Sequence, residues 1–544
     1  MLKLKKHQLL FILIVLLSIF LRFYKLGSIP AGFHHDEVSQ AYNSFAIGTT
    51  GHDRYGEYFP ILFRSFGSYQ PPVYTYLSPI PILLFGNTVF AARFLSALSG
   101  VIIVIFTYLI VLELTKEKYK YNLSLIAALI VAISPWAIQF SRRVVEGNLG
   151  LSIFLISLFL FIRSLKTPKV LPWAAFIMGI STQAYYSERI ASTIFIPIFL
   201  AVFWKYYFKY KRLVFFALFL FGLTQLPHLW ILTTGAYARR FAQVSYFNND
   251  PGDLPRALYL ILEFTKHFLS YISPRNLFSD TGVDLGRVSP DLGVFYSWLF
   301  IPFLVGIVNF LKQAKSLFFK LLLMLAPISL VSASLTGDVF YPLRILEFLW
   351  IVSIAISLGI LVILNAVRNK TLGFVIFGIL IIYSLIAFYI SHAVLLKYET
   401  QEYMADSYIK LNEYLKKYDD KKIIIDSGRD FAIGVRIAYF RKFDAGKMAS
   451  ILKPQLTSDY YSSEVSLREV YKIDNILVRP LIWEEDPCQK NTILIGDSLA
   501  ISEKQAKDHD LTEVFDVKTS DKKIVLKAYS TNQDLNCKPN LLGS

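Results

Sequence analysis

The sequence is poor in charged residues and contains almost no cysteine. Of 544 residues only 18% are charged and two are cysteine, whereas 54% are hydrophobic, and the mean hydropathy is +0.47. Soluble globular proteins average about 25% charged residues, so this composition excludes an ordinary soluble domain. Both cysteines, Cys488 and Cys537, lie near the C-terminus, where a disulfide is permitted but does not follow from spacing. Walker, GxGxxG, HExxH and paired CxxC motifs are also absent from the sequence.

The sequence instead contains many long apolar runs. A bilayer's hydrocarbon core is about 30 Å thick, and roughly 20 apolar residues of helix are needed to cross it. About eleven such runs occur before residue 396 and none after it. The sequence therefore predicts an α-helical polytopic membrane protein of about eleven transmembrane helices in residues 1–396, followed by a separate domain in residues 397–544. The runs cover approximately residues 8–24, 90–114, 122–140, 148–163, 171–187, 190–207, 213–234, 292–311, 316–335, 343–365 and 371–392.

The net charge of +16 would suggest a nucleic-acid partner if the positive charges were clustered, but they are not. With a cytoplasmic N-terminus, the inner segments hold 18 Lys and Arg against two acids, Glu113 and Glu117, and the outer segments up to residue 396 hold 15 against 14. This asymmetry follows the positive-inside rule. The basic charge thus reports orientation rather than nucleic-acid binding, and we expect a multi-pass plasma-membrane protein whose C-terminal domain is extracytoplasmic.

The loops on the expected outer side are long. Residues 25–89 and 235–291 form the two longest, and long loops in compact proteins tend to carry function. Within the second, residues 255–272 have the apolar spacing of a helix that lies at the interface. The tail predicts an α/β domain, with helices near 401–418 and 502–509, strands at 422–426, 475–481 and 492–496, and a terminal hairpin.

The first acids of the chain, Asp36 and Glu37, follow the first apolar run and precede a helical segment. One interpretation is that Asp36 caps this helix, as Asp readily does. The other is that it acts as a general base that takes a proton from an acceptor hydroxyl, an effect worth about 10²–10⁴-fold in rate. The two interpretations are compatible. Asp53, further along the same loop and followed by Gly56, is more typical of a turn.

Other charged residues stand at the outer ends of later spans. SRRVVEG places Arg142 and Arg143 within helical reach of Glu146, and YSERI pairs Glu188 with Arg189. Solvated ion pairs are the simplest interpretation of both.

Arg344, in LTGDVFYPLR, has two interpretations. An arginine just inside a span usually extends its charge to the interface. Its guanidinium would also suit a lipid-linked phosphate, because it can hold two oxygens at once. Arginine makes up 13 of the 15 outer basic residues before residue 397 but 3 of the 18 inner ones. Topology alone explains on which side positive charge lies, but it does not explain the preference for arginine over lysine on the outer side.

Together these segments resemble the GT-C superfamily of polyprenyl-phosphate-sugar-dependent glycosyltransferases. The closest likeness is to protein O-mannosyltransferases and their bacterial relatives, including lipid A aminoarabinose transferases. The resemblance covers roughly residues 1–395 and departs from the family pattern at Tyr69-Gln70 and Arg287-Val288. It rests on the order of the Asp36-Glu37 pair, GHDRYGEYFP, PPVYTYL, AARFLSALSG, SPWAIQFSRRVVEG, GISTQAYYSER, SPRNLFSDTGVDLGRV and SLTGDVFYPLR.

The resemblance implies an inverting transfer, at the external face, of a monosaccharide from a polyprenyl-phosphate donor to a hydroxyl of a protein, lipid or cell-envelope glycan. Asp36 then inherits the role of catalytic base, with Glu37 beside it, and Arg344 that of donor-phosphate ligand. Arg142, Glu146 and Arg189 are expected to line the same cavity. The donor and membrane lipid are thus the expected ligands, no metal ligand is assigned, and a divalent ion stays an open question.

Two other classes of protein agree less well with the sequence. A transporter or flippase for lipid-linked sugars would place ionisable residues at mid-membrane, often on broken helices within inverted repeats. Here the acids before residue 397 sit at span ends or in loops, and no repeat is visible. A scaffold anchored by its membrane part would not need about eleven spans.

Overall fold

The computed structural model describes residues 5–116, 118–279, 289–312, 316–401 and 404–532. Arg287, Val288 and Cys537 lie outside these residues. Contacts divide the chain into two compact units. The first comprises Met1–Ile29, Pro71–Tyr74 and Arg93–Leu396, and the second Pro30–Gln70, Thr75–Ala92 and Lys397–Ser544. Most of the first long loop therefore packs with the C-terminal segment.

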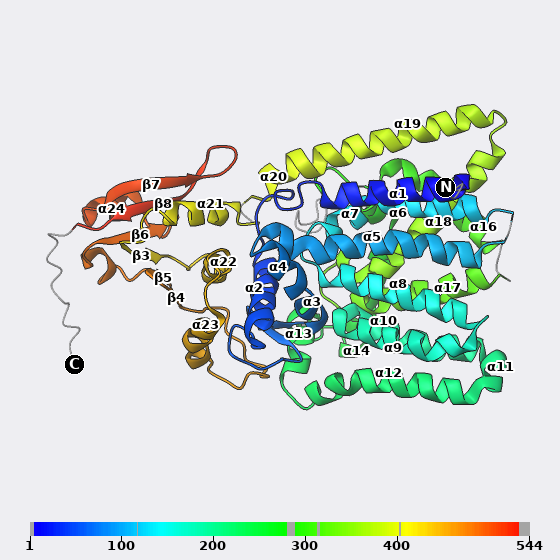
Figure 1. The fold of residues 1–544 in the computed structure, drawn as a ribbon, viewed down its shortest axis with the longest axis horizontal. Coiled ribbons are helices and arrows are strands. Elements are labelled where there is room, and N and C mark those ends of the chain that lie inside the picture. The colour runs from blue at the N-terminus through cyan, green and yellow to red at the C-terminus, as the bar shows by residue number, and fades with distance from the viewer. Residues whose placement is uncertain (1–4, 117, 280–288, 313–315, 402–403, 533–544) are drawn as a thin grey trace. The chain divides into compact units, whose positions relative to one another are not determined.

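The first unit is helical, and its long helices run side by side (Figure 1). In a helix the backbone groups bond to one another, and apolar side chains can face the lipid, as a bilayer requires. The helices are α1 (Lys6–Phe23), α5 (Val89–Leu114), α6 (Lys120–Ile133), α7 (Pro135–Ser141), α8 (Glu146–Ser164), α9 (Leu171–Ala184), α10 (Tyr186–Val202), α11 (Trp204–Tyr207), α12 (Lys211–Ile231), α13 (Ala236–Val244), α14 (Arg256–Ile272), α15 (Pro274–Phe278), α16 (Phe300–Leu311), α17 (Leu317–Ser334), α18 (Leu346–Ala366) and α19 (Lys370–Tyr389). The short helix α20 (Leu396–Glu399) begins at the last residue of this unit.

Within the described residues, six helical segments are long and apolar enough to span a membrane, and the bent pair α6–α7 would make a seventh. The protein is therefore a multi-pass membrane protein. Two of the remaining expected spans are shorter helices, because breaks at Tyr185 and Phe203 limit α9 and α10 to 14 and 17 residues. Between α6 and α7 the axis bends by 56°, since Pro135 holds the preceding Ser134 in an extended conformation.

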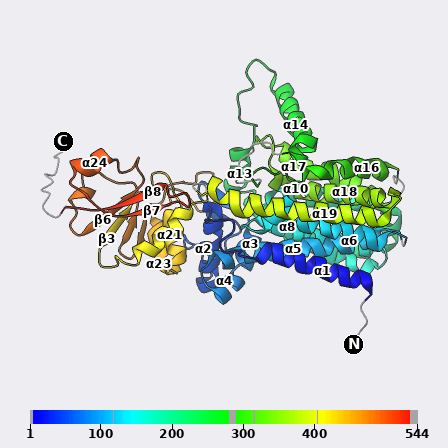
Figure 2. The ribbon, with the colours of Figure 1, turned by 90° about the horizontal axis from the view of Figure 1, so that it is seen from above.

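Small residues bring the central helices together. Helix α18 is almost wholly buried, and its Gly359 lies against the carbonyl of Pro302 in α16 so closely that a Cβ would overlap it. Gly306 of α16 meets the carbonyl of Ala355 in the same way. This is the packing expected where small residues let transmembrane backbones approach. The expected helix at 255–272 is α14, which projects from the other helices in Figure 2.

The second unit contains a mixed six-stranded sheet of order β4-β5-β3-β6-β8-β7 (Figure 1). The central strand β3 runs parallel to both β5 and β6, so that Ile424 lies between Leu477 and Leu494. Such strands are buried on both faces and are continuously apolar, which is why the sequence located all three. The strands are β3 (Lys422–Ile425), β4 (Tyr471–Ile473), β5 (Ile476–Val478), β6 (Thr492–Gly496), β7 (Thr512–Lys518) and β8 (Ile524–Ser530), and the accompanying helices are α21 (Asp406–Leu415), α22 (Ile433–Phe440), α23 (Ala445–Leu452) and α24 (Glu503–Asp508).

The first long loop supplies the rest of this unit. It forms α2 (His35–Thr50), the hairpin β1 (Phe63–Ser65) and β2 (Ser68–Gln70), and the short helices α3 (Pro72–Leu77) and α4 (Pro79–Phe85). Helix α2 packs against α4, α22 and α23. Before α2, the amide of Phe33 donates to Met404 O at 2.6 Å, and Gly32 has a φ of +86° that favours glycine.

Cys488 takes part in a disulfide. Cys537, the only other cysteine of the sequence, lies outside the described residues.

Candidate active site

Asp36 lies in the first turn of α2, but it does not cap the helix. His34 is the N-cap, and its Nδ1 accepts a hydrogen bond from the Asp36 amide at 3.3 Å. The carboxylate of Glu37 accepts from the His34 amide at 3.1 Å, which completes a capping box. The Asp36 side chain stays 57% exposed, whereas Glu37 is buried. The two acids therefore differ in what they can do: Asp36 is accessible to an incoming hydroxyl, and Glu37 holds the helix start.

The backbone of Asp36 is also held from the hairpin, because Gln70 Nε2 donates to its carbonyl at 3.3 Å. Gln70 belongs to the Tyr69-Gln70 pair, one of the two places at which the sequence departs from the family pattern, and here it supports the turn that carries Asp36.

Two histidines accompany this carboxylate. Oδ2 of Asp36 lies 3.8 Å from His34 Nδ1 and 3.7 Å from His35 Nε2. Within the part of the chain that the structure describes, these three residues form the group whose ligand atoms, all within 4.8 Å of one another, could hold a metal ion. The sequence interpretation assigned no metal ligand and overlooked both histidines, although two consecutive histidines before an acid are a visible signal.

In the first unit, three of the expected residues converge on Tyr185 and Tyr186, at the junction of α9 and α10. Tyr185 lies within electrostatic range of Arg344 and Glu146. Gly147, next to Glu146 at the start of α8, permits this approach, because a Cβ there would lie 3.3 Å from the Tyr185 ring. Arg189 stacks its guanidinium over Tyr186, 4.4 Å from the ring centroid.

Arg344 stands in a 3₁₀ turn, Pro342–Ile345, that leads into α18. Its Nη1 lies 2.8 Å from Asp338 Oδ2 and donates to Thr336 Oγ1 at 2.5 Å. The guanidinium stacks on Tyr341, 4.3 Å from the ring centroid. Arg344 is thus fixed in position, and an anion that bound there would share it with Asp338.

Among the described residues, Arg189 has fewer hydrogen-bond partners than Arg344. Its Nε and Nη2 are buried and have no hydrogen-bond partner among the described residues. Arg240 of α13, which sequence reasoning did not single out, lies within electrostatic range of both Tyr185 and Tyr186. The cluster therefore combines three arginines, Arg189, Arg240 and Arg344, with aromatic rings, an arrangement suited to an anionic group.

Arg142 has other partners. Its Nη1 donates to Leu21 O at 2.7 Å, and its Nη2 donates to Tyr24 O at 2.7 Å and to Ile29 O at 2.9 Å. These carbonyls belong to the end of α1 and the residues that follow it. The arginine therefore fixes the point at which the chain leaves the first helix.

Glu188 does not pair with its neighbour Arg189 as the sequence suggested. Its carboxyl group faces instead that of Glu347 of α18, and both side chains are buried. Two carboxyl groups so placed can be joined by a hydrogen bond when they share a proton. Gly150 of α8 leaves the space for Glu188, since a Cβ there would lie 2.9 Å from Glu188 Cγ.

Asp53 is structural, as its turn-like sequence indicated. It is fully buried and accepts hydrogen bonds from the Tyr55 amide at 2.9 Å, the Glu57 amide at 3.0 Å and the Tyr460 hydroxyl at 2.6 Å. Burial raises the pKa of Asp53 to about 6.

Comparisons with known proteins agree with this fold. The family model of the dolichyl-phosphate-mannose-protein mannosyltransferases matches residues 69–231. The solved structure of ArnT from Cupriavidus metallidurans bound to undecaprenyl phosphate is similar with a TM-score of 0.56 and 11% identity over 96% of this chain and 97% of that one. Its apo form gives 0.55, at the same identity and coverage.

The archaeal oligosaccharyltransferase AglB from Archaeoglobus fulgidus gives a TM-score of 0.47 and 14% identity, over 97% of this chain and 75% of that one. No curated protein matches the sequence. The family model matches less than half of the chain, and the ArnT likeness, at 11% identity, shows a shared fold; both agree with the resemblance to the GT-C superfamily that the sequence carries.

Proposed function

We propose that this protein transfers a monosaccharide from a polyprenyl-phosphate donor to an acceptor hydroxyl, with inversion, at the external face of the plasma membrane. The observation that carries the proposal is the Asp36 carboxylate, which stands exposed at the start of a helix whose cap is supplied by its neighbours. The GT-C fold and the partial match to mannosyltransferases support the class of reaction.

In the proposed reaction, Asp36 accepts the proton of the acceptor hydroxyl as its oxygen attacks the anomeric carbon. The bond from that carbon to the phosphate oxygen breaks, and its electron pair leaves with the lipid phosphate. One displacement at one carbon inverts its configuration. The leaving group is an anion that gains a second negative charge, so it needs positive charge more than it needs an acid.

Arg344 and Arg189 are the proposed ligands of the donor phosphate, with Glu146 lining the same cavity. Arg189 supports this assignment with buried N–H groups that have no hydrogen-bond partner within the described part of the chain, because such groups favour an anion. Arg142 contributes in a different way, by fixing the end of α1 from which the loop with Asp36 departs. Glu37 has the equivalent role at the start of α2.

The proposed donor carrier follows from the same likeness. The solved ArnT holds undecaprenyl phosphate, and a lipid of this class would present its reactive linkage at the membrane surface, where an amphiphile's head group lies. The positive-inside asymmetry of the loops supports a cytoplasmic N-terminus and an extracytoplasmic second unit. The proposed acceptor is a hydroxyl of a protein, a lipid or a cell-envelope glycan. The comparisons give no support to the transporter alternative.

The test is Asp36→Asn, with the protein reconstituted in vesicles with a radiolabelled polyprenyl-phosphate sugar and a membrane extract as acceptor. We expect transfer to fall at least 10²-fold, as loss of a general base implies, while folding and membrane insertion are unchanged. Asp459→Asn is the matched control, because its carboxylate is exposed in the same unit. Transfer by Asp36→Asn at the normal rate would refute the role of the base. Donor translocation without transfer by the unaltered protein would indicate a flippase.

A further inference from the structure

Arg54 is buried in the second unit and touches the helix that carries Asp36. Its side chain has no exposed surface, and its guanidinium lies between the rings of Tyr55 and Phe66, 5.0 and 4.7 Å from their centroids. From there Nη1 donates to Ser39 Oγ at 2.8 Å.

Ser39 belongs to α2 and lies three residues after Asp36, which places it about one helical turn away on the same side. Its hydroxyl also bonds that of Ser65 in β1 at 2.7 Å. One turn further on, Asn43 Oδ1 accepts a hydrogen bond from the Arg54 amide at 3.3 Å. Arg54 therefore holds α2 at two successive turns, through its side chain and through its backbone.

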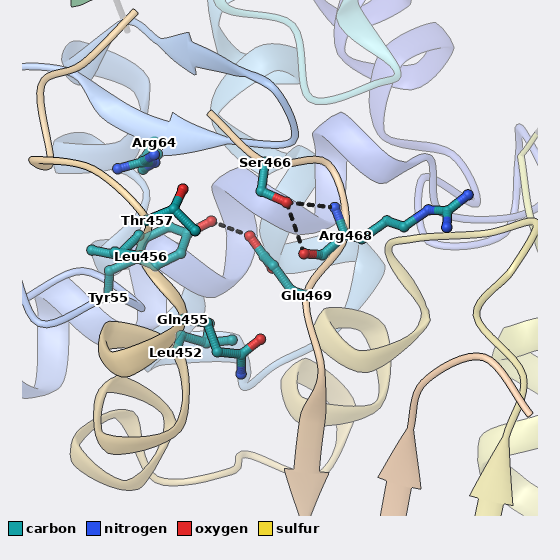
Figure 3. Close-up of a pocket in the computed structure, with 9 residues that line it drawn as sticks. All are labelled: Tyr55, Arg64, Leu452, Gln455, Leu456, Thr457, Ser466, Arg468 and Glu469. Atoms are coloured by element: carbon teal, nitrogen blue, oxygen red, sulfur yellow. Dashed lines mark hydrogen bonds between the residues drawn. The ribbon is translucent and has the colours of Figure 1, made fainter. Parts of the chain in front are cut away.

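The charge that balances Arg54 comes from the C-terminal segment. Glu469 Oε1 lies 3.6 Å from Arg54 Nη2. The hydroxyl groups of Tyr55 and Tyr471 both donate to this carboxylate, and Figure 3 shows Glu469 directed at Tyr55. Because Arg54 Nη2 also donates to the Tyr55 hydroxyl at 3.0 Å, the three groups form one closed network.

The network borders a small, partly open pocket that is lined by Tyr55 and Arg64 of the first loop and by Glu469 and Arg468 of the tail (Figure 3). Arg64 does not share in balancing the network, because its donors are used on the backbone carbonyls of Asp459, Tyr460 and Glu464 and on a serine hydroxyl. Glu469 is thus the carboxylate that faces the Arg54 guanidinium.

Removing one member of a buried ion pair is costly because the other charge is left uncompensated. Without Glu469, the guanidinium of Arg54 would have to move toward water or recruit another anion, and either change would break its bond to Ser39. A displacement of about 1 Å in a catalytic group costs up to about 10²-fold in rate.

We propose that Arg54 and Glu469 are positioning residues for Asp36, through which the C-terminal segment fixes the helix that carries the base. The inference rests on the proposed function, since it assigns these residues to the same reaction. It gives the tail a task in catalysis besides any contact with the acceptor: Glu469 holds Arg54, Arg54 holds Ser39, and Ser39 sets the orientation of the first turns of α2.

The experiment compares four variants with the full-length protein in vesicles: Glu469→Gln, Ser39→Ala, the double variant Arg54→Met with Glu469→Leu, and the control Glu464→Gln. Glu464 supplies a carboxylate from the same segment whose side chain is exposed. For each variant kcat and KM for the donor, binding of polyprenyl phosphate alone and the unfolding temperature are measured. Asp36→Asn is assayed in parallel.

We expect Glu469→Gln and Ser39→Ala to lower kcat about 10- to 100-fold and to leave phosphate binding within about twofold. The apolar double variant should recover stability, because such replacements of buried ion pairs are often neutral, but not kcat, because the hydrogen bond from Arg54 to Ser39 stays lost. Recovery of kcat together with stability would overturn the inference, as would normal kcat in Ser39→Ala. If Asp36→Asn alone retains transfer, the proposed function fails instead, and the two failures are distinguishable.

Discussion

Tyr460 donates its hydroxyl to Oδ2 of Asp53 at 2.6 Å, and this bond joins a turn of the first loop to a segment of the tail more than 400 residues away in sequence. Both side chains lie in the second unit, and the Asp53 carboxyl is fully buried. Burial, which outweighs the hydrogen bonds that it accepts, raises its pKa to about 6.

This shift makes the stability of the second unit depend on pH. The folded-state pKa of Asp53, about 6, exceeds the ordinary value of 3.8, so the folded state binds the proton more tightly. For this group alone, the free energy of unfolding should therefore rise as pH falls from 7 to 4, and it should stay constant below the pKa of the unfolded state. We expect the unfolding temperature to gain more between pH 7 and pH 5 in the unaltered protein than in Asp53→Asn. Equal gains would contradict the assignment.

Gly32→Ala should destabilise the second unit. The residue has a φ of +86°, and a Cβ there would overlap the carbonyl of Met404. Gly252→Ala is the matched control, because Gly252 also has a positive φ, +60°, but a Cβ there would have open space. Backbone strain in both costs of the order of 1 kcal/mol, so the extra loss in Gly32→Ala measures the overlap. Thermal unfolding in detergent measures the stability of both variants. Equal losses of stability would show that the backbone near Met404 moves aside without cost.

Arg344→Lys should weaken donor binding without unfolding the protein. Lysine keeps the charge but loses the planar fork that grips two phosphate oxygens, and it stacks less well on Tyr341. We expect KM for the donor to rise about tenfold, which corresponds to about 1.4 kcal/mol, with a smaller effect on kcat. Arg212→Lys, at an exposed position in the first unit, should change neither. An unchanged KM in Arg344→Lys would remove the residue from the phosphate site.

The Glu188–Glu347 pair yields a prediction about stability. Glu188→Gln should be tolerated, because the amide can donate to the remaining carboxylate in place of the shared proton. Glu188→Leu should destabilise by about 1–3 kcal/mol, because it leaves the buried carboxyl of Glu347 without a partner. The yield of monodisperse protein and its unfolding temperature test both variants. Equal behaviour of the two variants would mean that the carboxyl pair contributes no specific bond.

The sequence predicted the strands and helices whose residues follow a regular pattern along the chain. It missed the elements and contacts that depend on segments far apart in sequence. The buried strands β3, β5 and β6 were located from their continuous apolar residues, and α14 from its helical spacing. The short strand β4 and the hairpin of β1 and β2 were missed, because three residues carry little periodicity.

The same limit applies to the site residues, because their partners in the structure can lie far away in sequence. Asp36 was located by its place after the first span, but the cap was assigned to it rather than to His34, since histidine is an unusual N-cap. Glu188 was paired with its neighbour in sequence, whereas its partner, Glu347, belongs to a helix some 150 residues further on. No local pattern signals that Arg54 would meet Glu469.

The make-up of the second unit has a consequence for how the protein is made. Residues of the first loop emerge from the ribosome early, yet the strands and helices against which they pack are synthesised last, after some 300 intervening residues. The nascent loop must therefore wait, with Arg54 and Asp53 lacking their tail partners, until translation is nearly complete. A chain that stalls after its final transmembrane helix would be inserted in the bilayer but unable to assemble the loop that carries Asp36.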